Sequence, residues 1–147
     1  MSLKDRLSSD FKNALKNKDS IRKNVVNMVR AAIKQYEVDN RKELNDDGVV
    51  DIITKQVKMR KDALEDFKKG ERADLIEQYE AEIDILMEYM PTQLSEDEVR
   101  QIVLDTARKE GVQDKKEMGR LMGAVMPKVK GKADGNLVRK IVESILK

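Results

Sequence analysis

Apolar residues recur at spacings of three and four along almost the whole chain. This is the period of an amphipathic helix. Representative stripes are Leu3, Leu7 and Phe11; Ile21, Val25 and Val29; Val49, Ile53 and Val57; and Leu75, Tyr79 and Ile83. No segment sustains the period-two alternation typical of a half-buried strand. The sequence therefore predicts an all-α protein.

Capping and helix-breaking residues divide the first part of the chain into four longer helices. Ser2 is the expected N-cap of the first helix, and the second begins at residues 19–20. The third follows a predicted turn at residues 45–48 and ends where Gly70 can take a left-handed conformation. Pro91 ends the fourth helix, since proline cannot continue it.

The segment around Pro91 is the predicted domain boundary. Proline disfavours helical geometry in the residue before it, and Ser95 then begins a new capping box with Glu98. We predict an N-terminal four-helix domain at residues 1–91 and a small three-helix C-terminal module at residues 92–147.

Three shorter helices are expected after this boundary. The first stops near Gly111. Asp114 is the predicted cap of the second, which stops before Pro127, and Asp134 is the predicted cap of the third.

Charge is segregated along the chain although the formal net charge is only +2. Residues 1–36 carry nine basic and three acidic side chains, residues 37–110 carry twelve and twenty-one, and residues 111–147 carry nine and four. The basic ends could pack against the acidic middle, or one basic end could bind a polyanion. An acidic middle repels nucleic acid, so any such contact should be local.

The chain has neither cysteine nor histidine. This excludes thiolate and histidine nucleophiles, histidine general bases, disulfides, and zinc or haem sites built on those ligands. We expect no bound cofactor or metal. The first residues lack the apolar stretch of a signal peptide, and no later run approaches the roughly 20 apolar residues of a membrane span. We therefore expect a cytoplasmic protein with no membrane contact.

Gly119 and Gly123 are four residues apart and share one face of a predicted helix. Each glycine costs a helix about 1 kcal/mol relative to alanine. Close approach of a neighbouring helix would offset this cost, and so would close approach of a sugar-phosphate backbone, because both need a surface without side chains. The sequence leaves both explanations open.

Three lysines lie in the loop that leads to the helix capped by Asp134, namely Lys128, Lys130 and Lys132. Ammonium groups beside free helix amides can bind phosphate. A solvated basic loop is the alternative, and Asp134 would compete for the same amides. The candidate RNA-binding residues are Gly119, Gly123, Lys128, Lys130, Gly131 and Lys132.

All five aromatic residues precede Pro91: Phe11, Tyr36, Phe67, Tyr79 and Tyr89. The C-terminal module therefore has no ring on which a base could stack. Any RNA contact there should involve backbone and shape.

An acidic run offers the only dense set of candidate catalytic groups. Glu77, Glu80 and Asp84 share a helix face, where they could hold magnesium or act as an acid and base pair. The polar side of an amphipathic helix is the simpler interpretation. We expect no catalytic residues and no intrinsic activity.

The C-terminal residues carry a resemblance to a known family. Gly119, Gly123, Met126, residues 130–134 and the apolar helix after them resemble the tail domain shared by YqeY-like proteins and the B subunit of the bacterial tRNA-dependent amidotransferase. The remaining matches to stand-alone YqeY-like members are Lys16, Lys18, Asp19, Arg22, residues 30–34, Lys58, Arg60, Lys61, Asp62 and residues 89–91. The resemblance covers essentially the whole chain.

This resemblance implies an all-α fold, a bacterial source and a link to tRNA. In the amidotransferase the tail contacts tRNA, while activation and amide transfer occur in other domains that this chain lacks. The resemblance thus implies a non-catalytic accessory protein that binds tRNA or structured RNA. The alternatives are a module that docks on an amidotransferase-like protein partner, and participation in carbon–nitrogen ligase chemistry with glutamine as amide donor. The oligomeric state is not determined by the sequence.

Overall fold

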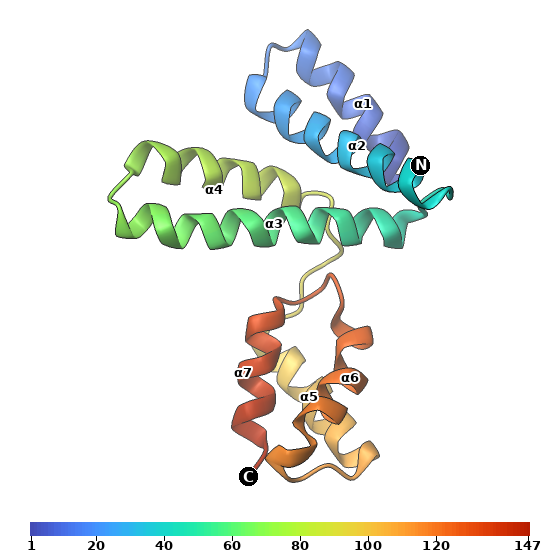
Figure 1. The fold of residues 1–147 in the computed structure, drawn as a ribbon, viewed down its shortest axis with the longest axis vertical. Coiled ribbons are helices and arrows are strands. Elements are labelled where there is room, and N and C mark those ends of the chain that lie inside the picture. Colours follow the sequence, from blue (N-terminus) through green and yellow to red (C-terminus); the bar gives the residue numbers. More distant parts are fainter. The chain divides into compact units, whose positions relative to one another are not determined.

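A computed structural model describes residues 1–147, and all of its regular secondary structure is helical. The prediction of an all-α protein is confirmed. The helices are α1 (Leu3–Lys16), α2 (Ser20–Asn40), α3 (Asp46–Lys69), α4 (Ala73–Met87), α5 (Glu96–Glu110), α6 (Met118–Val129) and α7 (Gly135–Ile145), with a 3₁₀ turn η1 (Lys115–Glu117) before α6 (Figure 1). None of these helices combines the length and the apolar character that a bilayer span needs.

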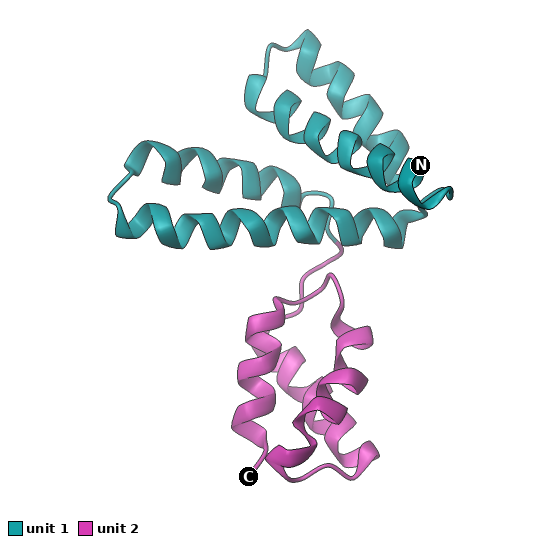
Figure 2. Ribbon diagram, viewed as in Figure 1, with its two compact units in different colours: residues 1–90 teal, residues 91–147 magenta.

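The chain forms two compact units, Met1–Met90 and Pro91–Lys147 (Figure 2). The first unit contains two helical hairpins, α1–α2 and α3–α4. Its core residues are Leu7, Val25, Val26, Val29, Ile33, Val49, Ile53, Val57, Ile85, Leu86 and Tyr89. The distal end of the α3–α4 hairpin lies outside this core and is closed by an edge-to-face contact of Phe67 with Tyr79, whose centroids are 5.0 Å apart.

The second unit has a core of its own, to which α5, α6 and α7 all contribute. Its buried residues are Val99, Val103, Ala107, Val112, Leu121, Val125, Val129, Val138, Ile141, Val142 and Leu146. The loop after α6 holds the segment that enters the unit. The Leu94 backbone N–H donates to the carbonyl of Lys132 at 2.8 Å, and the Gln93 side-chain amide donates to that of Gly131 at 2.8 Å.

Two predicted features around α3 were wrong in detail. Residues 45–48 are not a separate turn, because α3 begins at Asp46 and the Asn45 side chain accepts a hydrogen bond from the Gly48 N–H. Gly70 has an ordinary φ of −87°, and the left-handed residue is Glu71, with φ of 54°. The Asn45 cap explains the first difference. The second arises because the chain leaves the helical conformation one residue later than predicted.

Pro127 does not stop α6, which continues to Val129. Proline removes the N–H that would bond to the carbonyl four residues earlier. That residue is Gly123, which is exposed, so water can satisfy its carbonyl. The last turn of α6 therefore tolerates a residue that would break a buried helix.

The predicted capping box of α5 is present, and it makes the start of this helix sensitive to acid. Hydrogen bonds from Ser95 lower the pKa of Glu98 below its usual value. A lowered carboxyl pKa contributes stability that is present above the usual pKa and is lost as the pH falls through the lowered value. We expect Ser95→Ala to cost about 1 kcal/mol of stability. Thermal unfolding followed by far-UV circular dichroism at pH 7 and pH 3 checks this, and Glu98→Gln, whose side chain does not titrate, should lose less on acidification than the parent.

Candidate functional site

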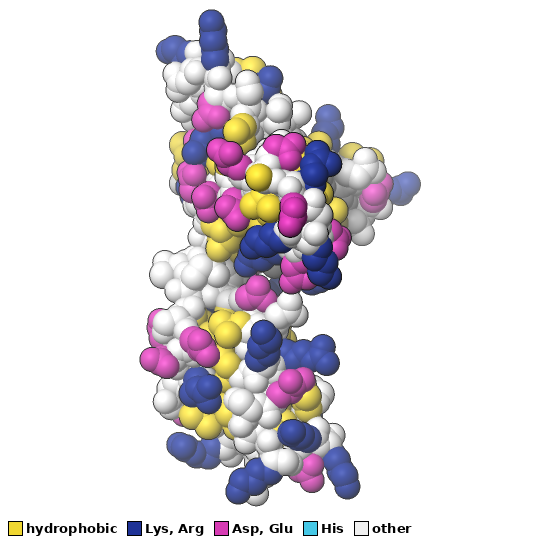
Figure 3. All heavy atoms as spheres, turned by 90° about the vertical axis from the view of Figure 1, so that its left-hand side faces the viewer, with side chains coloured by type: hydrophobic (Ala, Val, Ile, Leu, Met, Phe, Trp, Pro, Cys, Tyr) yellow, Lys and Arg dark blue, Asp and Glu magenta, His cyan; other side chains and the backbone are white.

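Charge alone does not mark a site on the face drawn in Figure 3. Figure 3 shows Lys and Arg side chains mixed with Asp and Glu over the visible face of each unit. Mixed charges of this kind are typical of solvated helix faces. The candidate site is therefore defined by the local geometry of the residues that the sequence singles out.

Gly119 and Gly123 lie on the solvent side of α6. Both are exposed, and a Cβ atom added to either would meet no atom within 4 Å. The explanation that a neighbouring helix requires these glycines is therefore wrong for this unit. Pro127, one further turn along, is also exposed. Residues spaced by four lie in one row on a helix, so α6 presents a row without long side chains, which we call the glycine ridge (Gly119, Gly123 and Pro127).

Cationic side chains lie on the row beside the glycine ridge. Arg120 and Lys128 are eight residues apart, and both are exposed. Arg120 makes ion pairs with Glu117 at 3.0 Å and Glu110 at 3.5 Å. Surface pairs of this kind contribute about 0–1 kcal/mol. Arg120 also donates to the Glu110 backbone carbonyl at 2.6 Å, and the remaining N–H groups of its guanidinium can bind an external anion.

Lys128 connects α6 to a shallow pocket on α5. Its Nζ donates to the hydroxyl of the buried Thr106 at 2.9 Å. The pocket has a volume of about 440 Å³ and is lined by Asp105, Arg108, Lys109 and Lys128. Three cationic side chains and one carboxylate line this pocket, so it is net positive. These cations also lie in the last turns of α5 and α6, where they stabilise the helix dipoles.

The sequence did not single out Arg108 and Lys109 beside Lys128, or Arg120 beside the glycine ridge. The first two are visible in the sequence only as the basic last turn of a helix. Their proximity to Lys128 depends on how α5 packs against α6.

The loop after α6 distributes the other predicted residues differently. Gly131 is buried, has φ of 74° and accepts the Gln93 hydrogen bond, so it forms the turn that holds residues 91–94. The side chains of Lys130 and Lys132 are exposed. The Asp134 side chain accepts from the Asn136 N–H at 2.7 Å. It therefore occupies one of the α7 amides that a phosphate would need.

The acidic run on α4 lies at the exposed surface of the helix. Glu77, Glu80 and Asp84 are exposed, and the neighbouring Glu82 is paired with Arg60 at 3.0 Å. No group of three or more Asp or Glu side chains is arranged to hold a metal ion. This arrangement fits the polar side of an amphipathic helix.

Comparison with known families assigns the chain to one of them. A family model described as "Yqey-like protein" matches residues 4–146. The chain belongs to the YqeY-like family. The match runs through both compact units, so the family relationship covers the surface of α6 as well as the N-terminal hairpins.

The YqeY-like chain is also similar to curated fungal proteins named "Altered inheritance of mitochondria protein 41, mitochondrial". It is 30% identical to the protein of Pyrenophora tritici-repentis, over 96% of this chain and 79% of that protein. It is 33% identical to the Kluyveromyces lactis protein, over 82% and 70% of the two chains. The match to the Lachancea thermotolerans protein is 36% identical over 57% of this chain and 46% of that protein.

These relatives correct two expectations for the YqeY-like chain. The sequence led us to expect a bacterial and cytoplasmic protein. The relatives are fungal, and their names state that they are mitochondrial. This comparison contradicts both expectations. This correction rests on the names of the relatives and not on a motif in the chain.

Proposed function

We propose that the C-terminal unit binds tRNA or another structured RNA, with the glycine ridge of α6 against the sugar-phosphate backbone. The exposure of Gly119 and Gly123 is the observation that carries this proposal. Two glycines cost the helix about 2 kcal/mol relative to alanine, and no contact inside the unit offsets that cost. An external polymer that approaches the helix backbone closely would offset it.

The surrounding charges support contact with phosphates. Arg120 and Lys128 lie beside the ridge, and Arg108 and Lys109 share the pocket of Lys128. If all four neutralise phosphates, log K should fall with log salt with a slope of roughly −3. Residues 91–147 contain no aromatic ring. Recognition would therefore depend on backbone and shape, which is how proteins bind structured RNA.

The resemblance to the amidotransferase tail makes tRNA the first RNA to test. In that enzyme the tail contacts tRNA while other domains activate and transfer the amide, so the resemblance supports an accessory function for this unit. The relation to the amidotransferase is itself part of this proposal, as is docking on an amidotransferase-like protein while RNA is bound.

Alanine substitution at the two ridge glycines tests the proposal. Because a Cβ meets open space at both positions, the Gly119→Ala/Gly123→Ala variant should fold and gain up to about 1 kcal/mol of stability per site. The added methyl groups should hold the RNA backbone away from α6 and weaken tRNA binding by about tenfold, which is 1.4 kcal/mol. Thermal unfolding and fluorescence anisotropy with labelled tRNA measure the two effects.

Gly70→Ala is the matched control. Its Cβ would make only an ordinary contact, 3.5 Å from the Asp66 carbonyl oxygen, and the residue lies in the other unit. This variant should leave tRNA binding unchanged. Equal affinity of the parent and the ridge variant would contradict the proposed surface. Duplex DNA that competes as well as tRNA would contradict recognition of structured RNA.

A further inference from the structure

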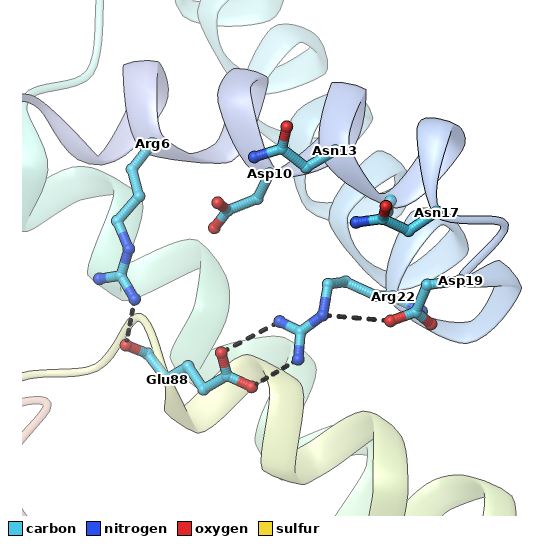
Figure 4. Close-up of a pocket in the computed structure, with 8 residues that line it drawn as sticks. Arg6, Asp10, Asn13, Asn17, Asp19, Arg22 and Glu88 are labelled. Carbon is cyan, nitrogen blue, oxygen red and sulfur yellow. Dashed lines mark hydrogen bonds and ion pairs between the residues drawn. The ribbon is translucent and has the colours of Figure 1, made fainter.

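A second pocket lies wholly within the N-terminal unit and shares no residue with the proposed RNA-binding surface. It has a volume of about 300 Å³. Its lining residues come from α1, the start of α2 and the end of α4 (Figure 4): Arg6, Asp10, Asn13, Ala14, Asn17, Asp19, Arg22 and Glu88. This volume is at the lower end of the range for ligand pockets, so the pocket suits a small molecule.

The two guanidinium groups of the pocket are fixed by partners within the protein. Arg22 binds Glu88 through two parallel hydrogen bonds of 3.0 and 2.9 Å, and its Nε lies 3.4 Å from an Asp19 oxygen. Arg6 donates to the Glu88 backbone carbonyl at 2.9 Å, and its guanidinium lies 4.6 Å from the centroid of the Tyr89 ring. Both side chains are therefore held in place without a ligand.

Asp10 is oriented into the pocket by a buried tyrosine. Tyr89 is buried and its hydroxyl donates to one oxygen of Asp10. Burial and the Asp10 carboxylate raise the pKa of Tyr89, so this hydroxyl keeps its proton and remains a donor. In Figure 4 the Asp10 carboxylate projects into the space between Arg6 and Arg22.

Several hydrogen-bond donors and acceptors around this space have no partner within the protein. The second oxygen of Asp10 accepts no hydrogen bond, and the side-chain amides of Asn13 and Asn17 make none within the protein. Arg6 uses only one of its terminal nitrogens. The pocket thus offers an anionic acceptor, a cationic donor and two groups that can both donate and accept.

The balance of charge decides the class of ligand. Three carboxylates and two guanidinium groups line the pocket, so a simple anion meets a net negative wall. A simple cation meets the fixed Arg6 and Arg22. We propose that this pocket binds a small zwitterion of the α-amino acid type, with its ammonium group on Asp10 and its carboxylate on Arg6. The two asparagine amides would contact the remainder of the molecule.

Nuclear magnetic resonance titration of the full chain with three probes tests this assignment. L-Alanine carries both charges, L-alaninamide only the positive one and N-acetyl-L-alanine only the negative one. The pocket is open to water, so L-alanine should saturate with a roughly millimolar dissociation constant. The backbone amides of residues 6–22 and of Glu88 should shift. Each single-charge probe should bind at least about tenfold more weakly.

Two variants separate binding from folding. Asp10→Asn keeps an acceptor for Tyr89 but removes the charge, and should weaken L-alanine binding by about tenfold. Asn17→Ala removes an exposed side chain that makes no hydrogen bond, and should weaken it by a smaller factor. Asn24→Ala is the matched control, because Asn24 is also exposed and does not line the pocket.

Three results would overturn the assignment. The first is the absence of saturable shifts with L-alanine, and the second is binding of either single-charge probe as tightly as L-alanine. The third is an equal loss of affinity in Asn17→Ala and Asn24→Ala, which would mean that the pocket is not the site.

Discussion

Removing the carboxylate of Glu82 should destabilise the N-terminal unit by about 3–5 kcal/mol. The side chains of Arg60 and Glu82 are only 8% and 12% exposed, and they pair at 3.0 Å between α3 and α4. Arg60 also donates to Gln56 and lies 3.6 Å from the Met28 sulfur. In Glu82→Leu this guanidinium would stay buried without a counter-charge, which is the costly half of a broken buried ion pair.

The double variant Arg60→Met/Glu82→Leu is the control for this prediction. Replacing both members of a buried pair with apolar side chains is often neutral or stabilising. The double variant should therefore recover most of the loss. Urea unfolding followed by tyrosine fluorescence measures it, because all three tyrosines lie in the N-terminal unit. A double variant as unstable as Glu82→Leu would show that packing, and not the unpaired charge, sets the cost.

Leu121→Ala should destabilise the C-terminal unit by about 2.7–5 kcal/mol. Leu121 is fully buried in the second core. A unit of this size has only a few kcal/mol of stability at best, since a small domain buries a small fraction of its surface. We therefore expect the variant to unfold most of residues 91–147 near room temperature and to lose tRNA binding with them.

Comparison of two spectroscopic signals checks that this loss is local. Far-UV circular dichroism reports both units, whereas tyrosine fluorescence reports only the first. Leu121→Ala should lower the unfolding midpoint followed by circular dichroism. It should leave the midpoint followed by tyrosine fluorescence unchanged, because the two cores share no residue. Leu104→Ala is the matched control, since Leu104 is 38% exposed on α5 and should cost under about 1 kcal/mol. A tyrosine transition that shifts with Leu121→Ala would contradict separate cores.

Local rules predicted the features whose partners are near in sequence. Ser2, Asp19, Ser95 and Asp134 each cap a helix as expected, because an N-cap bonds amides two or three residues away. The predictions for Gly70 and Pro127 were wrong, and in both cases the cause lies within a few residues of the position. The left-handed conformation occurs one residue later, at Glu71, and the exposure of Gly123 makes proline tolerable within the helix.

The candidate sites depended on contacts that no local rule contains. The spacing of Gly119 and Gly123 is visible in the sequence, but only their surroundings could choose between helix packing and an open surface. Arg108 and Lys109 meet Lys128 because α5 packs against α6. The pocket of Arg6, Asp10 and Arg22 needs Glu88, which is 66 residues from Arg22 in sequence.

The sequence by itself determined that this protein is helical, where most helices begin and that it belongs with YqeY-like proteins. Periodicity and capping involve only residues that are close together in the chain, so the sequence alone is enough to predict them. Tertiary structure alone decided which glycines face solvent, which cations gather and which polar groups enclose a pocket. Those outcomes depend on side chains that are distant in the chain and become neighbours only when the two cores form.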